Sequence, residues 1–250
     1  MEPIYERKFE ITAADTDRLG RLKCSHILTF LQEVAGDHSA ILGTDRDSLM
    51  RKGLFWAVIR HRVQITRLPG SGEKLTVQTW PMPTTRTAYP RSTVAYDEAG
   101  NECFRGISLW VLMDAESRAM VLPGKSGVTV SGMLTGSELA TPGSMALQAA
   151  GQTMRRTVRY TDLDVNGHMN NCRYLDWVDD TLPGSFHETH SASEFTVNYL
   201  SEAREGELLN LRFQLTDGPC LTVDALREEA VSTGHARVFS ARVLFRSGVL

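Results

Sequence analysis

The sequence predicts an α+β protein in which one helix followed by several antiparallel strands occurs twice in tandem. Three observations support this fold class. Residues 25–42 have the apolar spacing of a helix, strand-like runs follow them, and the same order of elements returns after residue 152. At 250 residues, the chain is long enough for two domains of roughly 125 residues, and either domain could form its own core.

In the first half, residues 1–10 alternate polar and apolar side chains, as a strand does. Residues 25–42 then place apolar side chains near one helical stripe, with Ser25 as the expected N-cap. The stripe consists of Ile27, Phe30, Leu31, Val34, Ala35, Ile41 and Leu42. Strands are expected at residues 56–65, 74–80, 87–97 and 103–113, with Gly, Pro, Asp and Asn in the turns between them.

Residues 123–152 are rich in Gly, Ser, Thr and Pro, which is typical of a linker. The expected organisation is therefore an N-terminal domain at 1–122, this linker, and a C-terminal domain at 153–250. The second domain should contain a strand at 154–160 and a short helix at 172–181. Further strands are expected at 193–200, 207–215, 221–229 and 235–245.

Charge and composition exclude several classes of partner. The 27 Lys and Arg residues nearly balance 30 Asp and Glu, so the net charge of −3 attracts neither nucleic acid nor anionic membrane strongly. We expect no nucleic-acid partner and no stable membrane insertion, since no long uncharged apolar run is present. The four cysteines lie far apart without C-x-x-C spacing, which favours a reduced, cytoplasmic protein.

A residue-level repeat links the two halves. Residues 14–21 align without a gap on residues 161–168, matching two Asp positions and one Gly position. The positions opposite Asn166 and His168 are Leu19 and Arg21, so only the second copy has the Asp-x-Asn-x-His set. This difference predicts that the C-terminal half performs the chemistry.

In an extended segment, the side chains of Asp164, Asn166 and His168 would share one face. His168 suits proton transfer near neutral pH, Asn166 can position a carbonyl or a water, and Asp164 can orient a donor or attack directly. The first N–H groups of the following helix could stabilise an oxyanion. The residues alone also allow a turn and cap, or a metal site with Asp162.

Residues 158–177 closely resemble the signature of the acyl-acyl carrier protein (acyl-ACP) thioesterases, the plant and bacterial enzymes with two fused hotdog domains. They read Val-Arg-Tyr-Thr-Asp-Leu-Asp-Val-Asn-Gly-His-Met-Asn-Asn-Cys-Arg-Tyr-Leu-Asp-Trp. The resemblance extends to residues 53–58, 108–114 and 198–209, and therefore to most of both halves. It implies tandem hotdog domains, each with a long helix packed on a curved antiparallel sheet.

The resemblance also implies site residues. The family's catalytic Asp, Asn, His and Glu fall on Asp164, Asn166, His168 and Glu202. Plant members commonly have Cys after that Glu, whereas this chain has Ala203, which favours a mechanism centred on carboxylates. The N-terminal domain is implied to hold the acyl chain without taking part in catalysis. Its expected substrate-binding residues are Phe30, Leu31, Val34, Trp56, Val58 and Trp110.

The implied function is hydrolysis of fatty acyl-ACP in fatty acid biosynthesis, with no cofactor and no metal. Hydrolysis of acyl-coenzyme A and a non-catalytic acyl-binding module are the alternatives. Unlike the plant enzymes, the chain shows no transit peptide, which suggests a bacterial cytoplasmic form. The carrier protein is acidic, and we expect basic residues to steer it, namely Arg86, Arg91, Arg155 and Arg156. Because hotdog sheets often pair across protomers, a homodimer is also compatible with the sequence.

Overall fold

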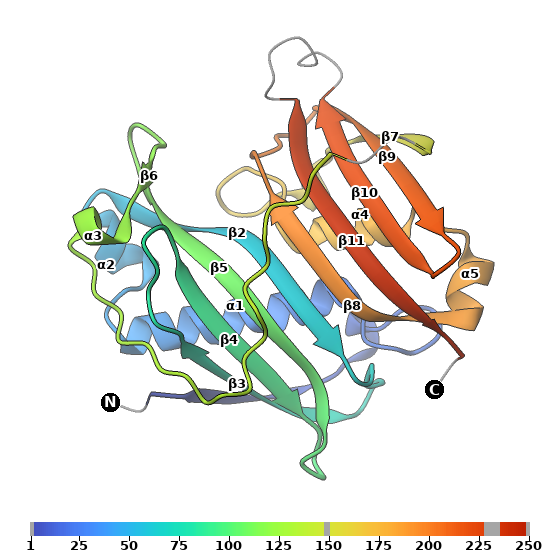
Figure 1. Ribbon diagram of the computed structural model, residues 1–250, viewed down its shortest axis with the longest axis horizontal. Coiled ribbons are helices and arrows are strands. Elements are labelled where there is room, and N and C mark those ends of the chain that lie inside the picture. The colour runs from blue at the N-terminus through green and yellow to red at the C-terminus, as the bar shows by residue number, and fades with distance from the viewer. Residues whose placement is uncertain (1–2, 148–150, 228–235, 249–250) are drawn as a thin grey trace. The chain divides into compact units, whose positions relative to one another are not determined.

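The computed structural model describes residues 3–147, 151–227 and 236–248 of the chain. The chain divides into two compact units. The first comprises Met1–Lys23 and Ile27–Pro142, and the second comprises Cys24–His26 and Gly143–Leu250. Each unit contains an antiparallel sheet and helices, as Figure 1 shows. The α+β class predicted from the sequence is therefore confirmed.

The first unit contains a sheet of strand order β1-β3-β4-β5-β2, with the short β6 paired to β5. Its strands are β1 (Tyr5–Glu10), β2 (Leu54–Ile65), β3 (Lys74–Pro81), β4 (Tyr89–Tyr96), β5 (Glu102–Asp114) and β6 (Met120–Val121). Its helices are the one-turn η1 (Ala13–Asp15), α1 (Cys24–Ile41), α2 (Arg46–Met50) and α3 (Pro123–Ser126). Figure 1 shows α1 along one face of this sheet.

Helix α1 packs closely on the sheet because its buried side chain Leu31 faces a glycine, Gly106, in strand β5. Ile27, Leu31 and Val34 are almost completely buried, as the helical spacing of the sequence predicts. A Cβ at Gly106 of β5 would lie 3.0 Å from Leu31 Cδ2 and 3.1 Å from Val63 Cγ2. Glycine at this position therefore lets the helix approach the strands, and larger side chains would force them apart.

The second unit contains a sheet of strand order β8-β11-β10-β9-β7. Its strands are β7 (Gln152–Thr157), β8 (His190–Tyr199), β9 (Leu208–Thr216), β10 (Cys220–Arg227) and β11 (Arg237–Ser247). Its helices are η2 (Tyr160–Asp162), α4 (Arg173–Asp179) and α5 (Gly184–Thr189). Trp177 of α4 and Phe239 of β11 are among the largest fully buried side chains.

The helices of the second unit are short, although the resemblance implied a long helix in each unit. Helix α4 has 7 residues and α5 has 6, whereas α1 has 18. Pro183 separates the two short helices and has extended backbone angles. Because proline lacks an N–H and disfavours helix at the residue before it, α4 cannot continue into α5.

The predicted strands and the two principal helices are confirmed, with ends within a few residues of those expected. Residues 1–2, 228–229 and 235 of the predicted strands lie outside the described residues. The expected N-cap is wrong, because Lys23 is the N-cap of α1 and Ser25 lies within the helix. The short elements α2, α3, α5 and β6 were missed. Part of the segment predicted as a linker packs within the first unit, where Val128 joins a buried cluster with Leu49, Leu54, Tyr89 and Leu112. Residues 148–150 of that segment lie outside the described residues. No helix in the described ranges has the length and apolarity needed to span a membrane.

Candidate active site

The segment between η2 and α4 forms a tight turn, so the expectation of an extended segment is wrong. Asp164 N–H donates to the His168 carbonyl at 2.8 Å, and Gly167 N–H donates to the Asp164 carbonyl at 3.0 Å. Gly167 has a φ of 74°, which glycine adopts without a Cβ clash. The side chains of Asp164, Asn166 and His168 therefore project from a reverse turn and do not share one face of a strand.

Asp164 stabilises this turn through its carboxylate. Its Oδ1 accepts the Asn166 N–H at 2.8 Å and lies 3.4 Å from the His168 N–H. The Asn166 amide Nδ2 lies 3.4 Å from Asp164 Oδ2. An Asp side chain that accepts backbone N–H groups two to four residues later is a common device for closing a turn. The Asp164 carboxylate thus closes the turn that carries Asn166 and His168.

His168 and Glu202 are brought together from two segments 34 positions apart in the sequence. The His168 Nε2 lies 3.2 Å from Glu202 Oε2, and 17% of the histidine side chain and 45% of the glutamate side chain are exposed. His168 also forms a backbone bridge with Arg204, and Met169 N–H donates to the Ala203 carbonyl at 2.8 Å. An imidazole beside a carboxylate, open to solvent, can accept a proton from a water molecule.

Two residues that the sequence analysis did not select hold the turn containing Glu202. Arg227, at the end of β10, donates to the Glu202 carbonyl, to Ser201 Oγ and to Glu207 Oε2. The phenol of Tyr174 in α4 lies buried beside the Ala203 backbone of this turn, and burial raises its pKa, so it stays protonated at neutral pH. Both residues lie far from Glu202 in the sequence, and no local motif points to them.

The predicted oxyanion role for the start of the following helix is not supported. Cys172 N–H donates to Asn170 Oδ1 at 2.9 Å, and Arg173 N–H donates to the Asn170 carbonyl at 2.9 Å. These two N–H groups are already satisfied, and α4 has only 7 residues. Cys172 itself is buried at the N-cap position.

The first unit contains the same turn with different side chains. Asp17 Oδ1 accepts the N–H groups of Leu19 at 2.8 Å and Arg21 at 2.9 Å, and Gly20 has a φ of 76°. Where the second unit has His168, Arg21 pairs with Asp17 at 2.9 Å. The aspartate and the glycine therefore define the turn in both units, and the residues around them differ.

Backbone contacts also align the two turns that face these loops. Leu22 N–H donates to the Pro69 carbonyl at 2.8 Å, as Met169 N–H does to Ala203. Arg21 forms a bridge with Gly70, as His168 does with Arg204. Pro69 thus corresponds to Ala203, and Leu68 occupies the position of Glu202. At the three corresponding positions, the first unit therefore has no Asn, His or Glu.

The residues predicted to bind the acyl chain all belong to the first unit, three on α1 and three on β2 and β5. Phe30, Leu31 and Val34 of α1 are buried, and Trp56 and Trp110 pack against the cluster around Tyr89. Val58 pairs with Trp110 across β2 and β5. The contact of these side chains with an acyl chain stays a prediction.

Of the four arginines predicted to steer a carrier protein, Arg91 is placed wrongly by the sequence argument. It is only 7% exposed and donates to His38 Nδ1 at 3.1 Å and to Thr79 Oγ1 at 3.4 Å. Arg156 pairs with Asp180 and stacks over Trp177, with 4.7 Å between the guanidinium and the ring centroid. Arg86 and Arg155 are exposed, and their role in steering stays a prediction.

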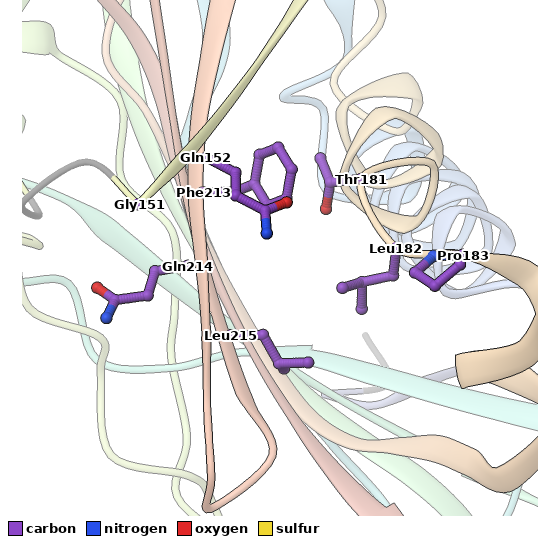
Figure 2. Close-up of a pocket in the computed structure, with 8 residues that line it drawn as sticks. All are labelled: Gly151, Gln152, Thr181, Leu182, Pro183, Phe213, Gln214 and Leu215. Carbon is purple, nitrogen blue, oxygen red and sulfur yellow. The ribbon is translucent and has the colours of Figure 1, made fainter.

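A cavity of about 260 Å³ lies in the second unit at the far end of α4 from the catalytic loop. Figure 2 shows Thr181, Leu182 and Leu215 around it, with Gln214 on the opposite side of its strand. Ligand pockets usually measure about 300–1,000 Å³, so this one is small. None of its lining residues was predicted to bind substrate. Across the described ranges, no group of three or more His, Cys, Asp and Glu side chains is arranged to hold a metal ion.

Two models of known protein families match most of this chain. The model of the acyl-ACP thioesterase N-terminal domain matches residues 2–122, and that of the C-terminal domain matches residues 146–242. The chain therefore belongs to the acyl-ACP thioesterase family. This confirms the resemblance found in the sequence.

Individual relatives agree with this assignment. The chain is 25% identical to the chloroplastic dodecanoyl-[acyl-carrier-protein] hydrolase of Cinnamomum camphora, over 82% of this chain and 58% of the relative. It is 26% identical to the chloroplastic palmitoyl-acyl carrier protein thioesterase of Gossypium hirsutum, over 84% and 54%. The chain thus spans a little over half the length of these curated relatives.

Solved structures share the whole fold. An acyl-ACP thioesterase from Bacteroides thetaiotaomicron superposes with a TM-score of 0.87 at 23% identity, covering 98% of both chains. The 12:0-ACP thioesterase from Umbellularia californica gives 0.82 at 24% identity, covering 99% of this chain and 98% of the other. At this identity the likeness establishes the fold and leaves the substrate open.

Proposed function

We propose that this protein hydrolyses the thioester of a fatty acyl-ACP and releases a free fatty acid in fatty acid biosynthesis. The observation that supports this most directly is the pairing of His168 Nε2 with Glu202 Oε2 at 3.2 Å. Asn166 precedes His168 by two residues, and the second unit has all three side chains at the compared positions, whereas the first unit has none of them. Membership of the thioesterase family supports the same reaction.

In the proposed mechanism, His168 accepts a proton from a water molecule while the water oxygen attacks the thioester carbonyl carbon. The Glu202 carboxylate stabilises the imidazolium that forms. The tetrahedral intermediate then expels the carrier thiolate, which takes the proton from His168. The products are a fatty acid and the free thiol of the carrier, so atoms and charges balance.

Asn166 and Asp164 have separate roles in this proposal. Asn166 is exposed at the tip of the turn, where its amide can hydrogen-bond the thioester oxygen or the water. Asp164 fixes the turn through the N–H groups of Asn166 and His168. Because the bonds to Oδ1 hold the Asp164 carboxylate against the turn, we propose water as the nucleophile.

Parallel hydrolysis assays test whether the protein is a thioesterase and whether it prefers acyl-ACP or acyl-coenzyme A. The purified protein should release thiol from an acyl-ACP at least tenfold more efficiently, in kcat/KM, than from the coenzyme A thioester of the same chain. Comparable or better turnover of acyl-coenzyme A would favour the alternative enzyme class. If neither donor released thiol at any acyl length tested, the protein would be a non-catalytic acyl-binding module.

We also propose that the acidic carrier protein approaches under electrostatic attraction from Arg86 and Arg155, both of which are exposed. Raising the salt concentration should then raise KM for acyl-ACP while leaving kcat nearly constant, because screening weakens attraction between exposed charges. A KM independent of salt would count against this steering. The homodimer and the cytoplasmic location stay predictions, which light scattering and cell fractionation would test.

A further inference from the structure

Arg227 joins three parts of the turn that contains Glu202. Its Nε donates to Glu207 Oε2 at 2.9 Å, its Nη1 donates to Ser201 Oγ at 2.8 Å, and its Nη2 donates to the Glu202 carbonyl. The donors of one planar guanidinium thus hold both ends of the turn and the backbone of Glu202 itself.

This contact matters because it holds the backbone from which the Glu202 side chain extends towards His168. Its side chain is 45% exposed, and its carboxylate must stay near His168 Nε2. A surface glutamate samples many rotamers, so its reach depends on where its backbone is held. By fixing the Glu202 carbonyl from β10, Arg227 fixes the point from which the carboxylate extends.

The corresponding turn of the first unit has an arginine in a different place. There Arg67, which corresponds to Ser201, donates to Glu73 at 2.9 Å and to Asp97 at 3.2 Å. Its other hydrogen bond goes to Cys103 Sγ at 3.5 Å, and none of these bonds reaches the carbonyl of Leu68. Both units therefore close the turn with an Arg–Glu ion pair, at Arg67–Glu73 and Arg227–Glu207. In the second unit, the arginine of this pair also holds the residue at the Glu202 position.

We propose that Arg227 is a positioning residue for thioester hydrolysis, which holds the Glu202 backbone so that the Glu202 carboxylate meets His168. The inference rests on the proposed function, because it gives a role to a contact behind the proposed catalytic pair. Arg227 does not touch the reacting atoms and acts through Glu202.

The test compares Arg227→Met with Arg67→Met, which removes the matched ion pair from the non-catalytic turn. Arg227→Met should lower kcat for acyl-ACP by about 10- to 100-fold with KM changed less than about threefold, since small displacements of catalytic groups are costly. Arg67→Met should keep kcat within about twofold. Arg227→Lys, with fewer donors, should give an intermediate kcat.

A double-mutant cycle with Glu202→Gln separates positioning from a merely structural role. If Arg227 acts through Glu202, Arg227→Met should change kcat less than about twofold in the Glu202→Gln background. Equal losses in both backgrounds, or wild-type kcat in Arg227→Met, would overturn the inference alone. Should Arg227→Met not fold, the cycle with Arg227→Lys decides by the same criterion. Absence of thiol release by the unmodified protein would overturn the proposed function together with the inference.

Discussion

The loops at residues 12–23 and 159–170 share a backbone and differ in what they could catalyse. In both, an aspartate, Asp17 or Asp164, accepts the N–H groups two and four residues later. In both, a glycine with positive φ completes the turn. The second loop adds Asn166 and His168, and the turn facing it adds Glu202. The comparison teaches that Asp164 belongs to the architecture of the loop, while the three other residues distinguish the copy for which we propose catalysis.

The interiors of the two units also differ, but here the first unit has the polar side chains. In the first unit, His61, Ser108 and Arg91 lie opposite one another on neighbouring strands. The carbonyls of Cys103 and Val238 each accept two backbone N–H groups in the same way, which aligns these strands with those of the second unit. In the second unit, the three equivalent positions are occupied by Phe195, Val243 and Leu221. The proposed catalytic unit thus has an apolar row where the other unit buries polar and charged groups.

The largest effect is expected from converting the second loop into the first. The triple variant Asn166→Leu, His168→Arg and Glu202→Leu should lose at least about 1,000-fold in kcat/KM, because base and orienting groups disappear together. It should still fold, since the arginine introduced by His168→Arg can pair with Asp164 as Arg21 pairs with Asp17. Activity assays and denaturant unfolding check both parts. Retained activity would break the comparison.

Substitutions of the shared aspartate sharpen the comparison. Asp164→Ala and Asp17→Ala should each lower the free energy of unfolding by about 1 kcal/mol, because two N–H groups near the surface lose their acceptor. Asp164→Asn keeps an acceptor oxygen and should keep kcat within about tenfold. A loss of more than about 1,000-fold in a folded Asp164→Asn protein would instead indicate that Asp164 is the nucleophile.

A further prediction concerns the buried polar side chains of the first unit and the dependence of stability on pH. His61 is completely buried, and this burial lowers its pKa from 6.5 to about 3. The unfolded chain therefore binds a proton between these values that the folded protein does not, so stability is full above pH 6.5 and falls as pH drops. By pH 5 the loss is about 2 kcal/mol. Denaturant unfolding at pH 7 and at pH 5 should show this loss in the free energy of unfolding, and the loss should be smaller in His61→Gln. An equal loss of unfolding free energy in the wild-type protein and in His61→Gln would show that His61 is not its cause.

The sequence predicted more of the fold than of the site. Apolar periodicity located α1 and most strands, because burial of one face is a local property of the chain. The shape of the catalytic turn was missed, since it depends on Gly167 φ and on the bonds of the Asp164 carboxylate. The alternative interpretation of this segment as a turn and cap describes its local structure correctly. It serves both units and does not by itself exclude chemistry in one of them.

Contacts between distant segments could not be predicted from spacing. Glu202 was selected only through the family resemblance, although the structure places it 3.2 Å from His168. Arg227 lies in a strand with no motif around it, and its role depends on how β10 ends beside the turn. Arg91 was expected at the surface, because a lone charge in a strand gives no sign of which face is buried.

The most direct test of the central claim measures kcat/KM for acyl-ACP hydrolysis in His168→Ala and Arg21→Ala, which alter corresponding positions of the two loops. The account predicts a loss of at least about 100-fold for His168→Ala and a change within about threefold for Arg21→Ala. Near-normal turnover by folded His168→Ala, or an equal loss in Arg21→Ala, would contradict the assignment of the chemistry to the second unit.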